Sequence, residues 1–138
     1  MIRTTLPLIA FAASLALSGP ATAQRIGASV NCDPTAEDLL YVCHFDLTQN
    51  GEALPGSVFT ITPSMPSMPM AHNIAPIPAQ DLCTEGRGYH AYLKLDMHGD
   101  WALTLDFTAP RRDRIVINYR FLPTSSDRPT HHHGTHKH

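Results

Sequence analysis

The chain has 138 residues, 43% of them hydrophobic, and a formal net charge of −2 with histidine counted as neutral. This length predicts a single domain with a modest core, and the acidic balance argues against nucleic acid as a partner because phosphate binding requires a basic face. The sequence has no H-E-x-x-H motif, nucleophile elbow or phosphate-binding loop, so hydrolytic chemistry has no support and we do not expect an enzyme.

The segment 1–23 has the pattern of a cleaved secretory signal. Arg3 supplies a positive charge, an apolar run covers residues 6–17, and Ala21-Thr22-Ala23 is a cleavage site flanked by small residues. The apolar run is shorter than the roughly 20 residues that a membrane-spanning helix needs. We therefore expect export to the periplasm, cleavage after Ala23, and no membrane span in the mature protein.

The remainder of the chain is expected to be β structure up to residue 122. Runs of alternating polarity between turn signals predict strands, and the twelve prolines of the chain oppose helices. The strands are expected at residues 25–31, 39–47, 57–62, 88–97, 101–107 and 114–121, and the two runs that flank Gly99 are expected to pair as a hairpin. Segment 24–122 thus predicts an all-β fold, a small antiparallel β-sandwich of immunoglobulin-like outline, with a barrel as the alternative.

The three cysteines are Cys32, Cys43 and Cys83, and export permits disulfides among them. Three pairings are possible in principle. We favour Cys32 with Cys43, as a link between adjacent strands, because they flank a turn-like stretch at residues 33–38. Cys83 is then a spare thiol, with a Cu(I) ligand or a dimer link as the alternatives.

The most distinctive motif is a loop of soft ligands interrupted by proline. Its ligating side chains are Met65, Met68, Met70 and His72. Thioether sulfur suits Cu(I) and is a poor ligand for magnesium or calcium, and imidazole accepts both copper oxidation states. The alternative is that these methionines fill a core, but the polar, proline-rich context is a poor core strand. The motif predicts a copper site.

The prolines of this loop give the ligands an expected geometry. Pro66 and Pro69 favour extended backbone around them. In an extended chain, residues 68, 70 and 72 point to the same side, and a polyproline twist would bring Met65 toward them.

A second patch follows at Met97-His98-Gly99-Asp100-Trp101. Met97 closes an apolar strand face, so it is either a core residue or a further sulfur ligand for copper. His98 is expected to be a solvated turn residue. Trp101 is expected in the core, with a cation–π contact to Cu(I) as the lesser alternative.

The Met/His loop followed by Met97-x-Gly99-x-Trp101 resembles the YtkA-like/FixH-like domains, over roughly residues 56–117. These are exported or membrane-tethered β-sandwich proteins associated with copper handling and copper-oxidase assembly. The resemblance implies that the loop ligands and Met97 form or border the copper site. The chain departs from FixH-type members in lacking a retained membrane anchor, which favours a soluble copper carrier over direct assembly of a membrane-bound oxidase.

The tail at residues 123–138 is polar and is expected to be disordered. It carries five histidines: His131, His132, His133, His136 and His138. A histidine tract of this kind binds Cu(II) or Zn(II) without fixed geometry. Its interruptions distinguish it from a purification tag, and we interpret it as a capture arm for Cu(II).

Three functions follow from these residues. The first is a periplasmic chaperone that binds Cu(I) and delivers it to a copper enzyme, such as a multicopper oxidase, or to an exporter. The second is a structural assembly factor for a copper-containing oxidase. The third is a small cuproprotein in electron transfer, which is disfavoured because Cys83 lacks the His/Met neighbours of a blue-copper site.

Overall fold

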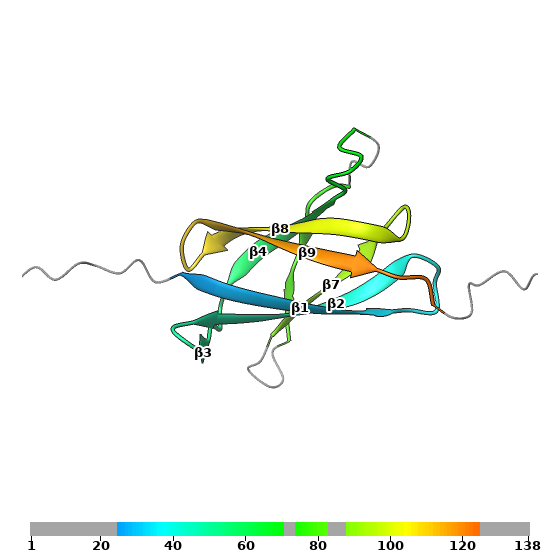
Figure 1. The fold of residues 1–138 in the computed structure, drawn as a ribbon. Coiled ribbons are helices and arrows are strands. Elements are labelled where there is room, and N and C mark those ends of the chain that lie inside the picture. The colour runs from blue at the N-terminus through cyan, green and yellow to red at the C-terminus, as the bar shows by residue number, and fades with distance from the viewer. Residues whose placement is uncertain (1–24, 71–73, 83–87, 125–138) are drawn as a thin grey trace, which may run out of the picture.

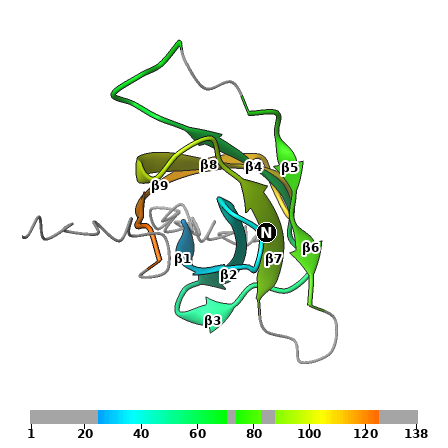
Figure 2. The same ribbon diagram turned by 90° about the vertical axis from the view of Figure 1, so that its right-hand side faces the viewer.

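The computed structural model describes residues 25–70, 74–82 and 88–124. Within these ranges the chain forms strands only, and it has no helix that is long and apolar enough to cross a membrane. The strands are β1 (Ile26–Pro34), β2 (Leu40–Gln49), β3 (Glu52–Ala53), β4 (Val58–Ser64), β5 (Ile77–Pro78), β6 (Gln80–Asp81), β7 (Tyr89–Lys94), β8 (Gly99–Ala109) and β9 (Asp113–Phe121). They form two facing layers (Figures 1 and 2).

The two sheets have the strand order of an immunoglobulin sandwich. One sheet, called sheet A, has the order β1-β2-β7-β6, with β3 attached to β2, and the other, called sheet B, has the order β5-β4-β8-β9. All pairs are antiparallel. Apart from the short β3 and β5, this arrangement matches the ABED and CFG sheets of a constant-type immunoglobulin domain. The predicted all-β sandwich is therefore confirmed.

The core lies between the two sheets and follows from the alternation in the sequence. Inward positions of β2 and β8 are buried, and outward positions are exposed or half-buried except for Ala102, which is also buried. Aromatic rings join the layers, since Phe59 of β4 stacks on Phe107 of the same sheet and meets Phe45 of sheet A edge-on at 5.9 Å. Burying each such side chain contributes about 1.5–3 kcal/mol to stability.

The hairpin expected around Gly99 is wrong, because the two runs belong to different sheets. β7 pairs with β2 and β6, whereas β8 pairs with β4 and β9. The Leu95 N–H donates to the carbonyl of Leu39 at 2.9 Å, so the chain keeps to sheet A beyond the end of β7. Alternation determines which face of a strand is buried and leaves its pairing partner open, and here residues 96–98 carry the chain from sheet A to sheet B at one end of the sandwich.

A disulfide joins Cys32 of β1 to Cys43 of β2, as predicted. The two cysteines are directly opposite in the register of these strands. The Tyr119 hydroxyl accepts a hydrogen bond from the Cys32 N–H at 3.1 Å, which ties β9 of sheet B to β1 of sheet A. Cys83 lies outside the described residues.

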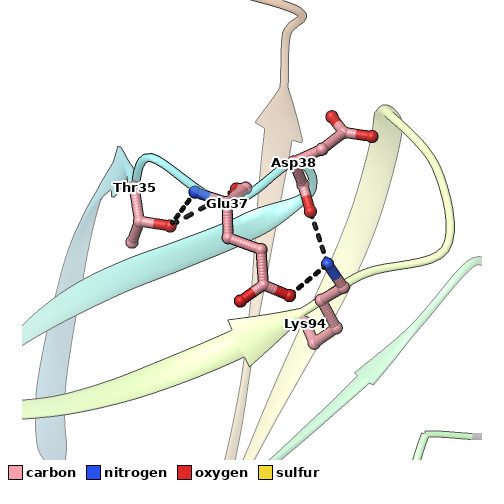
Figure 3. Close-up of polar contacts among 4 residues, drawn as sticks. All are labelled: Thr35, Glu37, Asp38 and Lys94. Atoms are coloured by element: carbon pink, nitrogen blue, oxygen red, sulfur yellow. Dashed lines mark hydrogen bonds and ion pairs between the residues drawn. The ribbon is translucent and has the colours of Figure 1, made fainter.

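The turn between β1 and β2 is held against β7 by Lys94 (Figure 3). The Lys94 ammonium donates to the Glu37 carboxylate at 2.7 Å and to the carbonyl of Asp38. The hydroxyl of Thr35 accepts from the Glu37 N–H at 3.1 Å and closes the turn. An exposed ion pair of this kind contributes little energy, but these contacts place Asp38 and Leu39 beside the segment that contains Met97.

The disulfide yields a test of the fold. Replacing both cysteines (Cys32→Ala with Cys43→Ala) should lower the free energy of unfolding by about 2–4 kcal/mol, because the unfolded chain regains the entropy that the cross-link removes. Denaturant titration of the oxidised wild type and the double variant measures this difference. Equal midpoints in the two proteins would contradict a Cys32–Cys43 bond that constrains the chain.

Candidate metal site

Three segments that carry or lead to the sequence-predicted ligands meet at one end of the sandwich. β4 ends at Ser64, opposite Ala102 near the start of β8. β8 begins at Gly99, opposite Phe121 at the end of β9. The loop after β4, the crossover before β8 and the segment after β9 therefore share this end, which we call the methionine end (Figure 1).

Met65 lies in the hydrophobic core at this end, with 5% of its surface exposed. Its methyl carbon lies 3.1 Å from the point that a Cβ on Gly99 would occupy, and Gly99 has a φ of 137°. The positive φ favours glycine at position 99, and a larger residue there would also displace the Met65 methyl group. Met65 thus packs the methionine end, and only its edge borders solvent.

The loop after Met65 turns sharply instead of continuing as an extended strand. The Met68 N–H donates to the Met65 carbonyl at 3.0 Å, with Pro66 at the second position of the turn, where proline is favoured. The expectation that Met68 and Met70 follow an extended chain is therefore wrong, because the proline initiates a turn. Met68 is 37% exposed and Met70 is 96% exposed. His72 lies outside the described residues.

Met97 lies at the surface of the same end and is not a core residue. Its side chain is 37% exposed. It lines a shallow depression together with Asp38, Leu39, Asp96, His98 and Pro123. Its carbonyl accepts a hydrogen bond from the indole N–H of Trp101 at 3.1 Å, which fixes the backbone of the crossover.

A larger groove of about 740 Å³ lies on the other side of the crossover. Met65 and Trp101 form part of its apolar lining, with Tyr119. Trp101 relates the two depressions, since it is one of the residues that border this groove and its indole N–H donates to the Met97 carbonyl. The predicted core position of Trp101 is confirmed by its 1% exposure.

An ion pair between Asp100 and Arg120 borders the groove. One carboxylate oxygen of Asp100 accepts from the Arg120 guanidinium at 2.9 Å. This hydrogen bond and the opposite charge lower the pKa of Asp100, and the same contacts raise the pKa of Arg120. The pair therefore stays charged at neutral pH. Its stabilising effect is present above the ordinary carboxyl pKa of 3.8 and is lost as the pH falls through the lowered value. Asp100 belongs to the second patch of the sequence, but its pairing with Arg120 was not predicted.

The described chain leaves the sandwich beside Met97. Pro123 borders the depression that contains Met97, and Thr124 borders an adjoining one with His98 and Tyr41. The histidine tail, including His131, His132, His133, His136 and His138, lies outside the described residues. Its point of departure is nevertheless at the methionine end.

Three of the potential donors at this end are thioethers. Within residues 25–70, 74–82 and 88–124, no group of three or more His, Cys, Asp or Glu side chains is arranged to hold a metal ion. The methionine end presents three thioethers at the surface, with Met68 and Met97 half-exposed and Met70 fully accessible, and Asp38, Asp96 and His98 line the same depression as Met97. Thioether sulfur is a soft ligand that suits Cu(I) and is a poor ligand for hard cations such as Mg²⁺ or Ca²⁺.

Comparison with known proteins gives a family match. The model of the family described as YtkA-like matches residues 32–106, more than half of the chain. A solution NMR structure of a lipoprotein from Bacteroides thetaiotaomicron is similar at 12% identity with a TM-score of 0.30, covering 80% of this chain and 92% of that protein. The search of curated proteins found no match.

Because Met65 is buried and Met70 is exposed, replacing them should change the free energy of unfolding by very different amounts. Met65→Ala should lower the free energy of unfolding by about 2–5 kcal/mol because it leaves a cavity in the core. Met70→Ala should change it by less than about 0.5 kcal/mol because the side chain is solvent-exposed. Chemical denaturation of both variants measures the contrast. Similar losses for the two would contradict the placement of Met65 in the core.

Proposed function

The chain belongs to the YtkA-like family, and we propose that its mature form is a periplasmic copper chaperone that holds Cu(I) at the methionine end. Export rests on the signal-like segment 1–23, with its charged start, apolar run and Ala21-Thr22-Ala23 cleavage pattern. The copper role rests on the soft ligands and on the association of YtkA-like/FixH-like domains with copper handling, which the motifs imply.

One observation carries the proposal: Met68 and Met70 are held at the surface on a proline turn instead of being used for packing. Met70 is 96% exposed, so burial gives no reason for an apolar side chain at this position. Met65, three residues earlier, is in the core and anchors the turn through its carbonyl. The loop thus separates one packing methionine from two accessible thioethers, which are available to bind a soft ion.

Accessible thioethers also suit the transfer of Cu(I) to an acceptor protein. A neutral sulfur ligand at the surface can be displaced by the ligands of an acceptor one at a time, so Cu(I) need not pass through water. His72 follows Met70 by two residues and supplies an imidazole for the same ion in this proposal. Met97 belongs to the same end and is a further sulfur donor in this proposal, on a crossover that the Trp101 indole holds through the Met97 carbonyl.

The histidine tail serves as a capture arm in this scheme. It starts beside Met97 and His98, and its imidazoles favour Cu(II). The acceptor is a copper-receiving periplasmic protein such as a multicopper oxidase or another cuproenzyme. The mature chain is not proposed to be an enzyme.

A Cu(I) titration tests the proposal. The parent is the mature chain, residues 24–138, with its five tail histidines replaced by Gln, which we call the tail-silent chain. In competition with a colorimetric Cu(I) chelator, the tail-silent chain should bind one Cu(I). Met68→Leu with Met70→Leu should weaken binding roughly tenfold or more, as loss of metal-site groups does. Leu is similar in volume to Met, so the fold should be retained.

Two matched variants complete this experiment. Val116→Leu changes another exposed apolar side chain, on β9, and should leave Cu(I) affinity unchanged. Met97→Leu should also weaken Cu(I) binding, because it removes the further sulfur donor, and an unchanged affinity would remove Met97 from the site. Equal Cu(I) affinity of the tail-silent chain and the Met68/Met70 double variant would refute the methionine end as the copper site. It would leave the tail or a role in oxidase assembly as the explanation.

A further inference from the structure

Two histidines face each other on the outer surface of sheet A, away from the core. His44 of β2 and His90 of β7 are directly opposite in the antiparallel register. Their neighbours Cys43, Phe45, Tyr89 and Ala91 are buried, so both imidazoles project from the outer face because side chains alternate along a strand. Neither histidine belongs to the methionine end or to the tail.

His44 and His90 form a non-hydrogen-bonded pair, the type of antiparallel pair in which facing side chains are closest. Cys32 and Cys43 have a Cα–Cα distance of 4.0 Å, which marks a non-hydrogen-bonded pair between β1 and β2. The backbone N–H and C=O of Cys43 then point to β7, so Cys43 and Ala91 are a hydrogen-bonded pair. His44 and His90, one residue further on each strand, are therefore a non-hydrogen-bonded pair, whose Cβ atoms are typically about 4.5–5.5 Å apart.

One ring nitrogen of His90 is buried without a hydrogen-bond partner in the part of the chain that the structure describes. Its Nδ1 is buried and has no hydrogen-bond partner among the described residues. The ring of Tyr92 lies perpendicular to the imidazole at a centroid distance of 6.0 Å and so covers one side of it. A buried ring nitrogen without a partner is unusual, because the great majority of buried polar atoms are hydrogen-bonded.

The rest of the outer face is polar and slightly acidic near the pair. Asn31 of β1 is opposite His44, and Gln80 of β6 is opposite His90, which gives a row of amide, imidazole, imidazole and amide across four strands. Asp46 is two residues beyond His44, on the same face of β2. Its carboxylate oxygen lies 3.3 Å from the point that a Cβ on Gly88 would occupy, so it leans toward the strand of His90.

We propose that His44 and His90 form a two-imidazole site for Cu(II), separate from the methionine end. Two imidazoles at a non-hydrogen-bonded pair are close enough to bind one ion, whose metal–nitrogen bonds are about 2.0–2.1 Å. Imidazole suits Cu(II), and Cu(II) binds a given nitrogen site more tightly than the other divalent first-row ions. Water would complete the coordination of an ion held by the two imidazoles, and Asp46 contributes negative charge nearby.

The test uses Cu(II) and the tail-silent chain, so that tail imidazoles do not compete. In NMR spectra, substoichiometric Cu(II) should broaden the ring signals of His44 and His90 before that of His98. His44→Gln and His90→Gln should each weaken Cu(II) binding roughly tenfold or more, as loss of metal-site groups does. His98→Gln removes an imidazole at the methionine end and should leave the affinity of this site unchanged.

Two controls keep the result interpretable. Thermal unfolding without metal should be similar for the parent and His44→Gln, since His44 is exposed on the sheet surface; if His90→Gln unfolds, His44→Gln alone decides the question. Unchanged Cu(II) affinity in His44→Gln, or first broadening at His98, would overturn the proposal. The Cu(II) site does not rest on the proposed function. Cu(I) binding at the methionine end should therefore be the same in His44→Gln and His90→Gln as in the parent.

Discussion

The burial of Trp101 between the sheets is the constraint on which the methionine end depends. Its side chain is almost completely enclosed, and its indole N–H is satisfied by the Met97 carbonyl. A buried indole requires such a partner, so the crossover from β7 to β8 must pass where that carbonyl is within reach. Met65 belongs to the same hydrophobic core cluster as Trp101. Core packing therefore fixes the relative position of the two methionine-bearing segments.

Aromatic packing closes the same end from the opposite side. Phe121, the last residue of β9, contacts Tyr41 and Tyr119 at centroid distances of 4.7 Å. Phe121 is opposite Gly99 in the register, so the start of β8 and the end of β9 are held together. The segment that leads to the histidine tail consequently leaves from a rigid part of the sandwich, beside His98 and Met97.

Much of the fold could be predicted from local patterns, and the failures have physical reasons. Alternation along residues 39–47 and 101–107 identified the buried faces of β2 and β8, because the side-chain period of a strand is two. The pairing of β7 with β2 was missed, since alternation is the same whichever strand is the neighbour. The Cys32–Cys43 bond was predicted because the two positions flank a short turn and are close in sequence.

The candidate site was predicted less completely than the fold. Ligand chemistry singled out the methionines, but sequence alone did not reveal that Met65 packs the core while Met70 is exposed. That division depends on Gly99, which leaves room for the Met65 methyl group, and on the turn at Pro66. The pairing of His44 with His90 was likewise missed, because 45 residues separate them in a sequence that does not reveal the register of β2 and β7.

The arrangement separates two kinds of ligand in one small domain. Thioethers occur at one end, on a turn whose backbone is tied to the core through Met65. The paired imidazoles are on the outer face of sheet A, where adjacent strands determine their spacing. Soft sulfur favours Cu(I) and imidazole nitrogen accepts Cu(II), so each oxidation state would have its own place on the surface. An ion that changed oxidation state would then lose affinity for one place and gain it for the other, without any change in the fold.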